Sequence, residues 1–202
     1  MVWLTAFFII FCPASLFATQ SGISVFGGFG YPSLKIENPD GTTAGYDGLA
    51  FQGGVQTALF GSPQSQLNLF LSYTLHDLEN TQTQSSGREF AKHRGMGLGL
   101  LYEFGSLYLG YELGFIEAEH FYVGQTGIES NFDYQKNSGF LGLRVPVGTV
   151  DFNFVYEVGT GKISNSETGF ASDSSLESQT FWLTVSFNSK TSVGKLTKGL
   201  IK

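Results

Sequence analysis

The chain has 202 residues, with 11 basic and 17 acidic side chains and a formal net charge of −6. An acidic chain of this length suits a single domain of ordinary size and is a poor partner for nucleic acid. Mean hydropathy is only +0.04 because polar residues are spread evenly among the apolar ones. After the N-terminus no window of about 20 apolar residues occurs, which excludes a bundle of membrane-spanning helices.

The first 18 residues carry no charged side chain and stay apolar up to the small and polar residues at 18–21. Such a segment is typical of a secretory signal peptide, which is removed from the mature protein. A permanent helical anchor is the alternative, but the apolar run is short for a span and Pro13 interrupts it. Cys12 is the one cysteine, so removal of residues 1–18 leaves no thiol for disulfides, catalysis or metal binding.

From residue 22 onward, apolar and polar residues alternate in eight segments long enough to cross a membrane as tilted strands. Their apolar faces begin and end, in chain order, with Ile23 and Tyr31, Leu49 and Leu59, Leu67 and Leu75, Met96 and Phe104, Leu107 and Phe115, Leu141 and Val147, Val150 and Val158, and Phe181 and Phe187. The first two segments are weaker, because Gly27 and Gly53 fall on the apolar face.

The connections between segments give an independent test of which residues lie on the same face of the sheet. Gly105-Ser106 and Gly148-Thr149 have the composition of two-residue hairpin turns. Such turns would bring Phe104 opposite Leu107 and Val147 opposite Val150, so that apolar faces apolar in each hairpin. These turns and the stretch 61–65 are short, whereas the polar stretches 37–47, 78–94, 120–132 and 161–177 are long.

The predicted fold is therefore all-β: an eight-stranded antiparallel up-and-down transmembrane β-barrel over residues 19–188, with short periplasmic turns and long extracellular loops. A soluble barrel or sandwich is the alternative, with the apolar faces pointing inward. The opposite faces carry Gly, Ser, Thr, Asn, Asp and Glu, which would form a poor apolar core. They suit a small lumen filled by polar side chains.

The pattern resembles the superfamily of small eight-stranded outer-membrane β-barrels that includes the OmpA membrane domain, OmpX, OmpW and the opacity proteins. The resemblance covers roughly residues 22–188 and rests on the architecture and on the aromatic-ended last segment, 179–187. It implies a monomer in the outer membrane of a Gram-negative bacterium, in contact with lipid and lipopolysaccharide. It also implies that the barrel assembly machinery recognises the last strand through Phe181, Leu183, Val185 and Phe187.

The chain departs from this family beyond that strand, because residues follow the terminal aromatic one. The stretch 189–202 contains four lysines and no acid, and we expect it to be a basic periplasmic tail.

Charged side chains on the polar faces are predicted to form a network in the lumen. Its members are Glu103, Glu112, Arg144, Asp151 and Glu157, with Lys136 and His76 nearer the long loops. Arg144 is expected to pair with Glu112 or Asp151. A structural salt-bridge network in a narrow lumen is the favoured interpretation, and a gated polar path is the alternative. The glycines between 95 and 99 are expected to make room for Phe140 or Trp182.

No residue pattern indicates catalysis, a metal or a cofactor. The histidines at positions 76, 93 and 120 are separated and give no zinc signature, and none has a serine two residues later, as in the His-X-Ser arrangement of outer-membrane deacylases. The sequence predicts a non-enzymatic structural or surface-interaction role, with four polar loops displayed to an unknown ligand. A narrow passive channel for small solutes is the alternative, and a lipid-modifying outer-membrane enzyme is the third choice.

Overall fold

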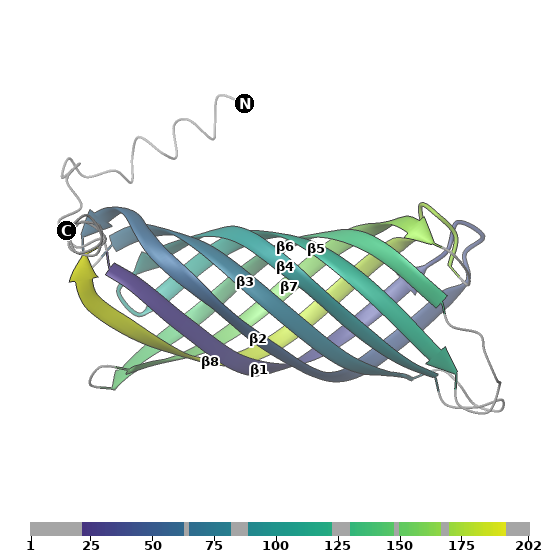
Figure 1. The fold of residues 1–202 in the computed structure, drawn as a ribbon, viewed down its shortest axis with the longest axis horizontal. Coiled ribbons are helices and arrows are strands. Elements are labelled where there is room, and N and C mark those ends of the chain that lie inside the picture. The colour runs from purple at the N-terminus through teal and green to yellow at the C-terminus, as the bar shows by residue number, and fades with distance from the viewer. Residues whose placement is uncertain are drawn as a thin grey trace, which may run out of the picture.

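The computed structural model describes residues 22–62, 65–81, 89–122, 130–147, 150–166 and 170–192. They form eight strands: β1 (Gly22–Glu37), β2 (Thr43–Ser62), β3 (Ser65–Asn80), β4 (Glu89–Phe104), β5 (Leu107–Tyr122), β6 (Ser130–Val147), β7 (Val150–Ser166) and β8 (Ser175–Ser192). Each strand pairs with the next, and β8 pairs antiparallel with β1, so the sheet closes into a barrel (Figure 1). The predicted eight-stranded, all-antiparallel closed barrel is confirmed. Among the described residues, no helix is long and apolar enough to cross a membrane.

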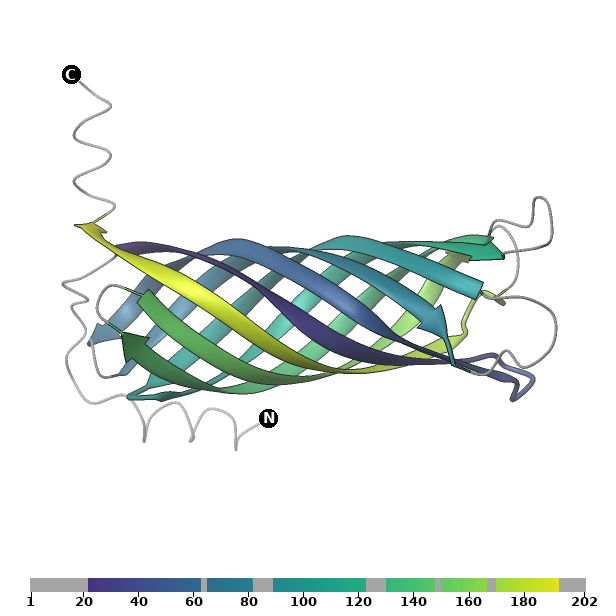
Figure 2. The same ribbon diagram turned by 90° about the horizontal axis from the view of Figure 1, so that it is seen from below.

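The two ends of the barrel are built differently. The end that we call the turn end holds the start of β1, the end of β8 and the connections 62–65, 104–107 and 147–150. The predicted hairpin pairings, Phe104 with Leu107 and Val147 with Val150, are present there. Gly105 has φ 60°, a left-handed conformation that glycine adopts without steric cost. The other ends of the strands lie at the opposite end, which we call the loop end, and the strands run between the two ends at a marked tilt (Figure 2).

The strands are longer than predicted, with 16 to 20 residues each. At the loop end, the stretches between strands are therefore only 38–42, 81–88, 123–129 and 167–174. Residues 43–47 and 89–94, predicted to belong to long loops, are strand residues instead. At the turn end β8 continues to Ser192, past the predicted barrel boundary at 188. The predicted signal peptide and residues 193–202 lie outside the described residues.

Apolar side chains project outward around the half of the barrel next to the turn end. Phe29, Phe51, Leu98, Phe154 and Phe181 are examples, each 49% to 65% exposed. On β4 this outward apolar row runs from Met96 to Phe104, which matches the roughly 9–11 residues that a tilted strand needs to cross a membrane. This band is therefore the lipid-facing surface.

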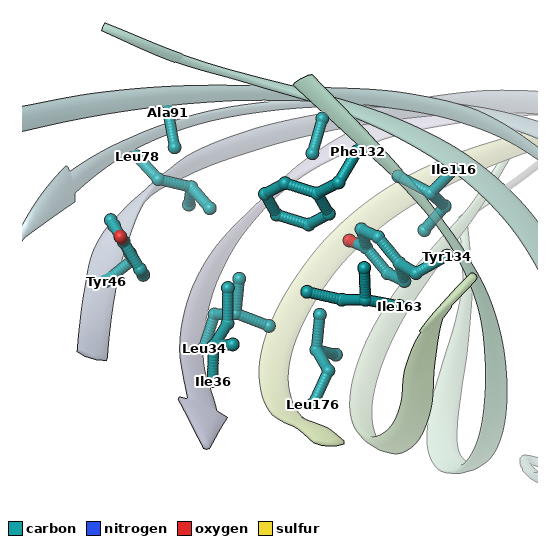
Figure 3. Packing of buried hydrophobic residues seen from close by; sticks show 11 residues of the cluster. Leu34, Ile36, Tyr46, Leu78, Ala91, Ile116, Phe132, Tyr134, Ile163 and Leu176 are labelled. Carbon is teal, nitrogen blue, oxygen red and sulfur yellow. The ribbon is translucent and has the colours of Figure 1, made fainter. Parts of the chain in front are cut away.

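Toward the loop end the polarity of the two faces is exchanged. Outward positions there carry charges, such as Lys92 and Arg94 on β4 and Glu117 on β5. Inward positions carry a buried apolar cluster, which we call the loop-end cluster: Leu34, Ile36, Tyr46, Leu78, Ala91, Ile116, Ala118, Phe132, Tyr134, Ile163 and Leu176 (Figure 3). Apolar inside and polar outside is the pattern of a barrel surrounded by water. The strands thus continue beyond the membrane as what we call the extension.

Glycines on the inner face make room for aromatic rings in the lumen. A Cβ on Gly99 would overlap the ring of Phe70, and one on Gly110 would overlap the ring of Phe140. The prediction that a glycine in 95–99 makes room for a large ring is therefore right, but the ring is that of Phe70. Phe140 lies against Gly110 and Trp182 lies against Gly30. The rings of Phe26, Phe70, Phe140 and Tyr108 meet edge to face and form what we call the aromatic layer.

Candidate functional site: the barrel lumen

Every predicted member of the lumen network lies on the inner face of the barrel. The carboxylates of Glu103, Glu112, Asp151 and Glu157 belong to buried residues, whereas the Arg144 side chain is 22% exposed. The structure does not gather them into one network. Arg144 and Glu103 interact near the turn end, and Glu112 and Glu157 lie in a second group further along the lumen.

Arg144 pairs with Glu103. Its Nη1 donates to Glu103 Oε2 at 2.5 Å, and its Nη2 donates to the carbonyl oxygen of Gly105 at 3.0 Å. Glu103 also accepts a hydrogen bond from Asn68 Nδ2 at 2.9 Å. The predicted pairing of Arg144 with Glu112 is wrong because of strand register. Arg144 stands level with Ser106 in the β4–β5 turn, whereas Glu112 lies opposite Ser138, much further along β6.

The second group is a buried ion pair that fixes a tryptophan. Lys136 Nζ donates to Glu157 Oε1 at 2.5 Å, and the two side chains are 7% and 6% exposed. Trp182 Nε1 donates to the other oxygen of Glu157 at 2.7 Å. Ser72 donates its hydroxyl to the neighbouring Glu112 at 2.5 Å. Charge pairing and hydrogen bonds of this kind offset the desolvation of the buried charges.

A cavity of about 70 Å³ lies between these two groups. Its lining includes the aromatic layer, Glu103, Glu112, Arg144, Glu157 and Trp182. At roughly 10–15 Å³ of such volume per water, it has room for about five water molecules. The cavity suits a few waters that hydrate the carboxylates, and it is too small for an organic solute.

The three histidines form a third group, which the sequence did not predict. The backbones of His76 on β3 and His93 on β4 are paired, and their rings stack at 6.2 Å. The rings of His93 and His120, on β5, stack at 5.5 Å, and their Nε2 atoms are 3.3 Å apart. The three residues are 0% to 8% exposed. We call this group the histidine column.

Both ends of the His93–His120 pair have hydrogen-bond partners. His93 Nδ1 is 2.9 Å from the Tyr134 hydroxyl, and His120 Nδ1 is 3.0 Å from Glu89 Oε1. Tyr46 donates to Glu89 Oε1 at 2.7 Å, and Asn80 donates to Glu89 Oε2 at 2.6 Å.

Glu89 lies in the extension, outside the membrane-spanning band. Burial acts to raise the pKa of this carboxyl group, but the hydrogen bonds from His120, Tyr46 and Asn80 outweigh it and leave the pKa below its ordinary value. Glu89 is therefore a carboxylate at neutral pH.

The rings of the histidine column are buried, and those of His93 and His120 are hydrogen-bonded to each other, to Tyr134 and to Glu89, so the column can hold and pass protons. Within the described part of the chain, no three His, Cys, Asp or Glu side chains are grouped to hold a metal ion. Sequence spacing could not reveal the column, because the eight residues 81–88 separate β3 from β4 and a connection of that length does not set the register of the two strands from sequence. On the outer face of β8, Phe181 and Phe187 are 65% and 56% exposed, and Leu183 and Val185 are partly exposed between them.

No family model and no curated protein matches the chain. Among solved structures it is similar to Neisserial surface protein A, with a TM-score of 0.52 and 16% identity over 84% of this chain and 99% of that one. It is also similar to Ail of Yersinia pestis in complex with the heparin analogue sucrose octasulfate, with a TM-score of 0.56 and 11% identity over 85% and 100%. Outer membrane protein AlkL matches with a TM-score of 0.50 and 14% identity over 90% and 96%. The chain has the fold of small eight-stranded β-barrels of the bacterial outer membrane.

Proposed function

We propose that this protein is a non-catalytic outer-membrane barrel whose extension presents a binding surface clear of the membrane. The exchange of polarity along the strands is the observation that carries the proposal. A barrel that only spanned the bilayer would need no second apolar interior beyond it. The extension has a buried core, so its outward side chains are held on a stiff sheet rather than on loops.

The layers inside the lumen support a surface role over solute transport. A conducting path needs a continuous wet route, but the loop-end cluster and the aromatic layer fill the interior at two levels. The cavity of about 70 Å³ beside the aromatic layer has room only for waters. Passive passage of solutes is therefore the weaker alternative.

The outward charges of the extension suggest the chemistry of the partner. Its acidic residues are Glu37, Asp47, Asp77, Glu79, Glu117, Glu119, Asp133 and Glu177, and its basic residues are Lys35, Lys92, Arg94 and Lys162. Ail is described with a heparin analogue, which is a polyanion. A polyanion would be repelled by the acidic excess of this chain. We infer a partner with a basic surface.

The environment of the barrel forms part of the same proposal. The lipid-facing band fits the outer membrane, with lipid and lipopolysaccharide around a monomer. The outward row Phe181, Leu183, Val185 and Phe187 is proposed as the signal read by the barrel assembly machinery. Export through a cleaved signal peptide at residues 1–18 completes this proposal.

Adhesion of cells that display the protein tests the surface role. Such cells should bind a surface coated with a basic protein, release it as salt rises, and ignore a heparin coat. A Glu117→Gln, Glu119→Gln, Asp133→Asn variant should bind less, because it loses acidic charges of the extension. The matched control is Asn131→Gln, which lies on the same outward face and changes no charge.

Binding to heparin by the parent protein, or unchanged binding by the triple variant, would contradict the proposed partner chemistry. Planar-bilayer recordings of the purified protein test the transport alternative. We expect no steady conductance, and a large, stable conductance at neutral pH would replace the surface role with the channel alternative.

A further inference from the structure

The histidine column lies inside the loop-end cluster, and the proposed surface role makes no use of it. His93 is 1% exposed and His120 is 0% exposed. Both rings contact Phe132, at 5.9 Å and 4.9 Å between centroids. Two basic rings in an apolar core would ordinarily be replaced by hydrocarbon, because their protonated forms are costly to bury. Their presence in contact with each other calls for a chemical reason.

The hydrogen bonds fix the positions of the protons in the neutral pair. The Glu89 carboxylate can only accept, so His120 donates to it through Nδ1. A neutral His120 then has only a lone pair at Nε2, and His93 must donate its Nε2 proton across the 3.3 Å gap. His93 Nδ1 is left to accept the hydroxyl proton of Tyr134. Each ring nitrogen of the neutral pair thus has a hydrogen-bond partner, and every hydrogen bond from Tyr134 through the two rings is donated toward Glu89.

The same geometry accepts one extra proton but not two. If His93 Nδ1 is protonated, Tyr134 can rotate its hydroxyl and become the acceptor. If His120 is protonated as well, two N–H groups face each other across 3.3 Å. Two positive charges would then be in contact among apolar side chains, where water does not screen them. The doubly protonated pair cannot keep its present packing.

One carboxylate faces the pair, and the remaining surroundings oppose a second positive charge beside the first. Glu89 on β4 is the carboxylate in contact, and the hydroxyls of Tyr46 on β2 and Tyr134 on β6 are neutral. β1, β5, β7 and β8 contribute apolar side chains of the loop-end cluster: Leu34, Ile36, Ile116, Ala118, Ile163 and Leu176.

Toward the membrane lie His76 on β3 and Lys136 on β6, and Lys136 is already paired with Glu157 on β7. Burial lowers the pKa of His93 well below its ordinary value, and His120, His76 and Lys136 lower it further. His93 therefore resists protonation at neutral pH.

A short segment at the loop end closes over the pair. Phe170 packs edge to face on His120 at 5.4 Å and on Phe132 at 5.3 Å. Ser174 donates its hydroxyl to Asn38 Oδ1 at 2.7 Å, and the Ala171 amide donates to the same oxygen at 3.4 Å. Residues 170–174, which we call the cap, are thus held by the β1–β2 turn on one side and by the His120 ring on the other. Its C-terminal part is also tied to β7, since Asp173 N donates to the Ile163 carbonyl at 3.1 Å and Ile163 N donates to the Ser174 carbonyl at 3.0 Å.

We propose that the His93–His120 pair is a proton-binding site that keeps the cap closed until both rings are protonated and then releases it. The ligand is the proton, taken from the medium at the loop end. Opening separates the two facing N–H groups and lets water reach both imidazolium rings. This property does not depend on the partner proposed for the outer surface, so either proposal can fail without the other.

A spin label on the cap tests the proposal directly. Ala171→Cys, in the full chain with Cys12→Ser, puts a nitroxide at an exposed cap position without touching the rings. The label should be immobile at about pH 7.5 and should gain a mobile fraction, reversibly, below the ordinary histidine range of about pH 6.5. His93→Gln should lose this transition, because its amide can still bridge Tyr134 and His120 but cannot carry the second charge.

His76→Gln is the matched control. His76 is buried in the same column, but its Nε2 has no hydrogen-bond partner among the described residues. The variant should keep the transition. Absence of any transition in the parent at every acidic pH at which the barrel stays folded, or an unchanged transition in His93→Gln, would overturn the proposal. If His93→Gln does not fold into a barrel, as judged by its heat-dependent migration on a gel, His120→Gln replaces it. The His120→Gln variant should also lose the transition, and an unchanged transition would overturn the proposal.

Discussion

The buried ion pair between Lys136 and Glu157 gives a quantitative test of the lumen. Each side chain is 7% exposed or less, and Glu157 also holds Trp182. Removing one partner of a buried pair typically costs about 3–5 kcal/mol, because the other charge stays buried without compensation. We therefore expect Lys136→Met or Glu157→Gln alone to lower the free energy of unfolding by about 3–5 kcal/mol. The double variant should recover much of this loss, since neither charge remains.

Equilibrium unfolding in urea, followed by circular dichroism in lipid vesicles, measures these values, and the coupling energy follows from the four proteins. The control is the exposed pair of Arg94 and Glu117, whose side chains are 54% and 65% exposed. Its disruption by Glu117→Gln should cost no more than about 1 kcal/mol. Losses below about 1 kcal/mol for both lumen variants, or additive losses in the double variant, would refute the buried pair.

Three further predictions follow from other parts of the barrel. Gly99→Ala should lower the free energy of unfolding by about 1–3 kcal/mol by displacing Phe70, whereas Gly139→Ala, with no atom within 4 Å of its Cβ, should be nearly neutral in the same urea titration. In the unfolded chain His93 takes up a proton near pH 6.5, whereas in the folded protein burial makes it resist protonation. The free energy of unfolding should therefore fall on acidification by up to about 1.4 kcal/mol per pH unit, and His93→Gln should flatten this slope. Arg144→Ala should show only small, unstable openings in bilayers, because the loop-end cluster is untouched; a large, steady conductance would contradict the filled lumen.

The membrane-spanning half of the barrel was predictable because lipid imposes a strict alternation. The predicted apolar rows face outward on all strands, including the two weaker ones, where Gly27 and Gly53 are paired across β1 and β2. Two-residue turns fixed the β4–β5 and β6–β7 registers, since a slip by one residue would have turned every apolar side chain into the lumen.

The extension was missed because its alternation runs in the opposite phase. Lys92 and Arg94 point outward while Ala91 and His93 point inward, so the stretch lacks the outward apolar row that predicts a lipid-facing strand. The signal was nevertheless present as period-2 alternation among charged residues. The histidine column and the pairing of Arg144 with Glu103 could not be predicted from the sequence. They depend on how far neighbouring strands are shifted along each other, and the sequence pattern shows only which face of the sheet each residue occupies.

A depth profile along the outer face of β4 tests most directly that the barrel leaves the membrane partway along its strands. Single nitroxides at positions 92, 94, 96, 98 and 100, in lipid bilayers, would be compared for collision with oxygen and with a water-soluble nickel chelate. The exchange of polarity predicts that Met96, Leu98 and Leu100 are reached by oxygen, and that Lys92 and Arg94 are reached by the chelate. Oxygen contact that continues through 94 and 92 would contradict the extension and, with it, the proposed binding surface.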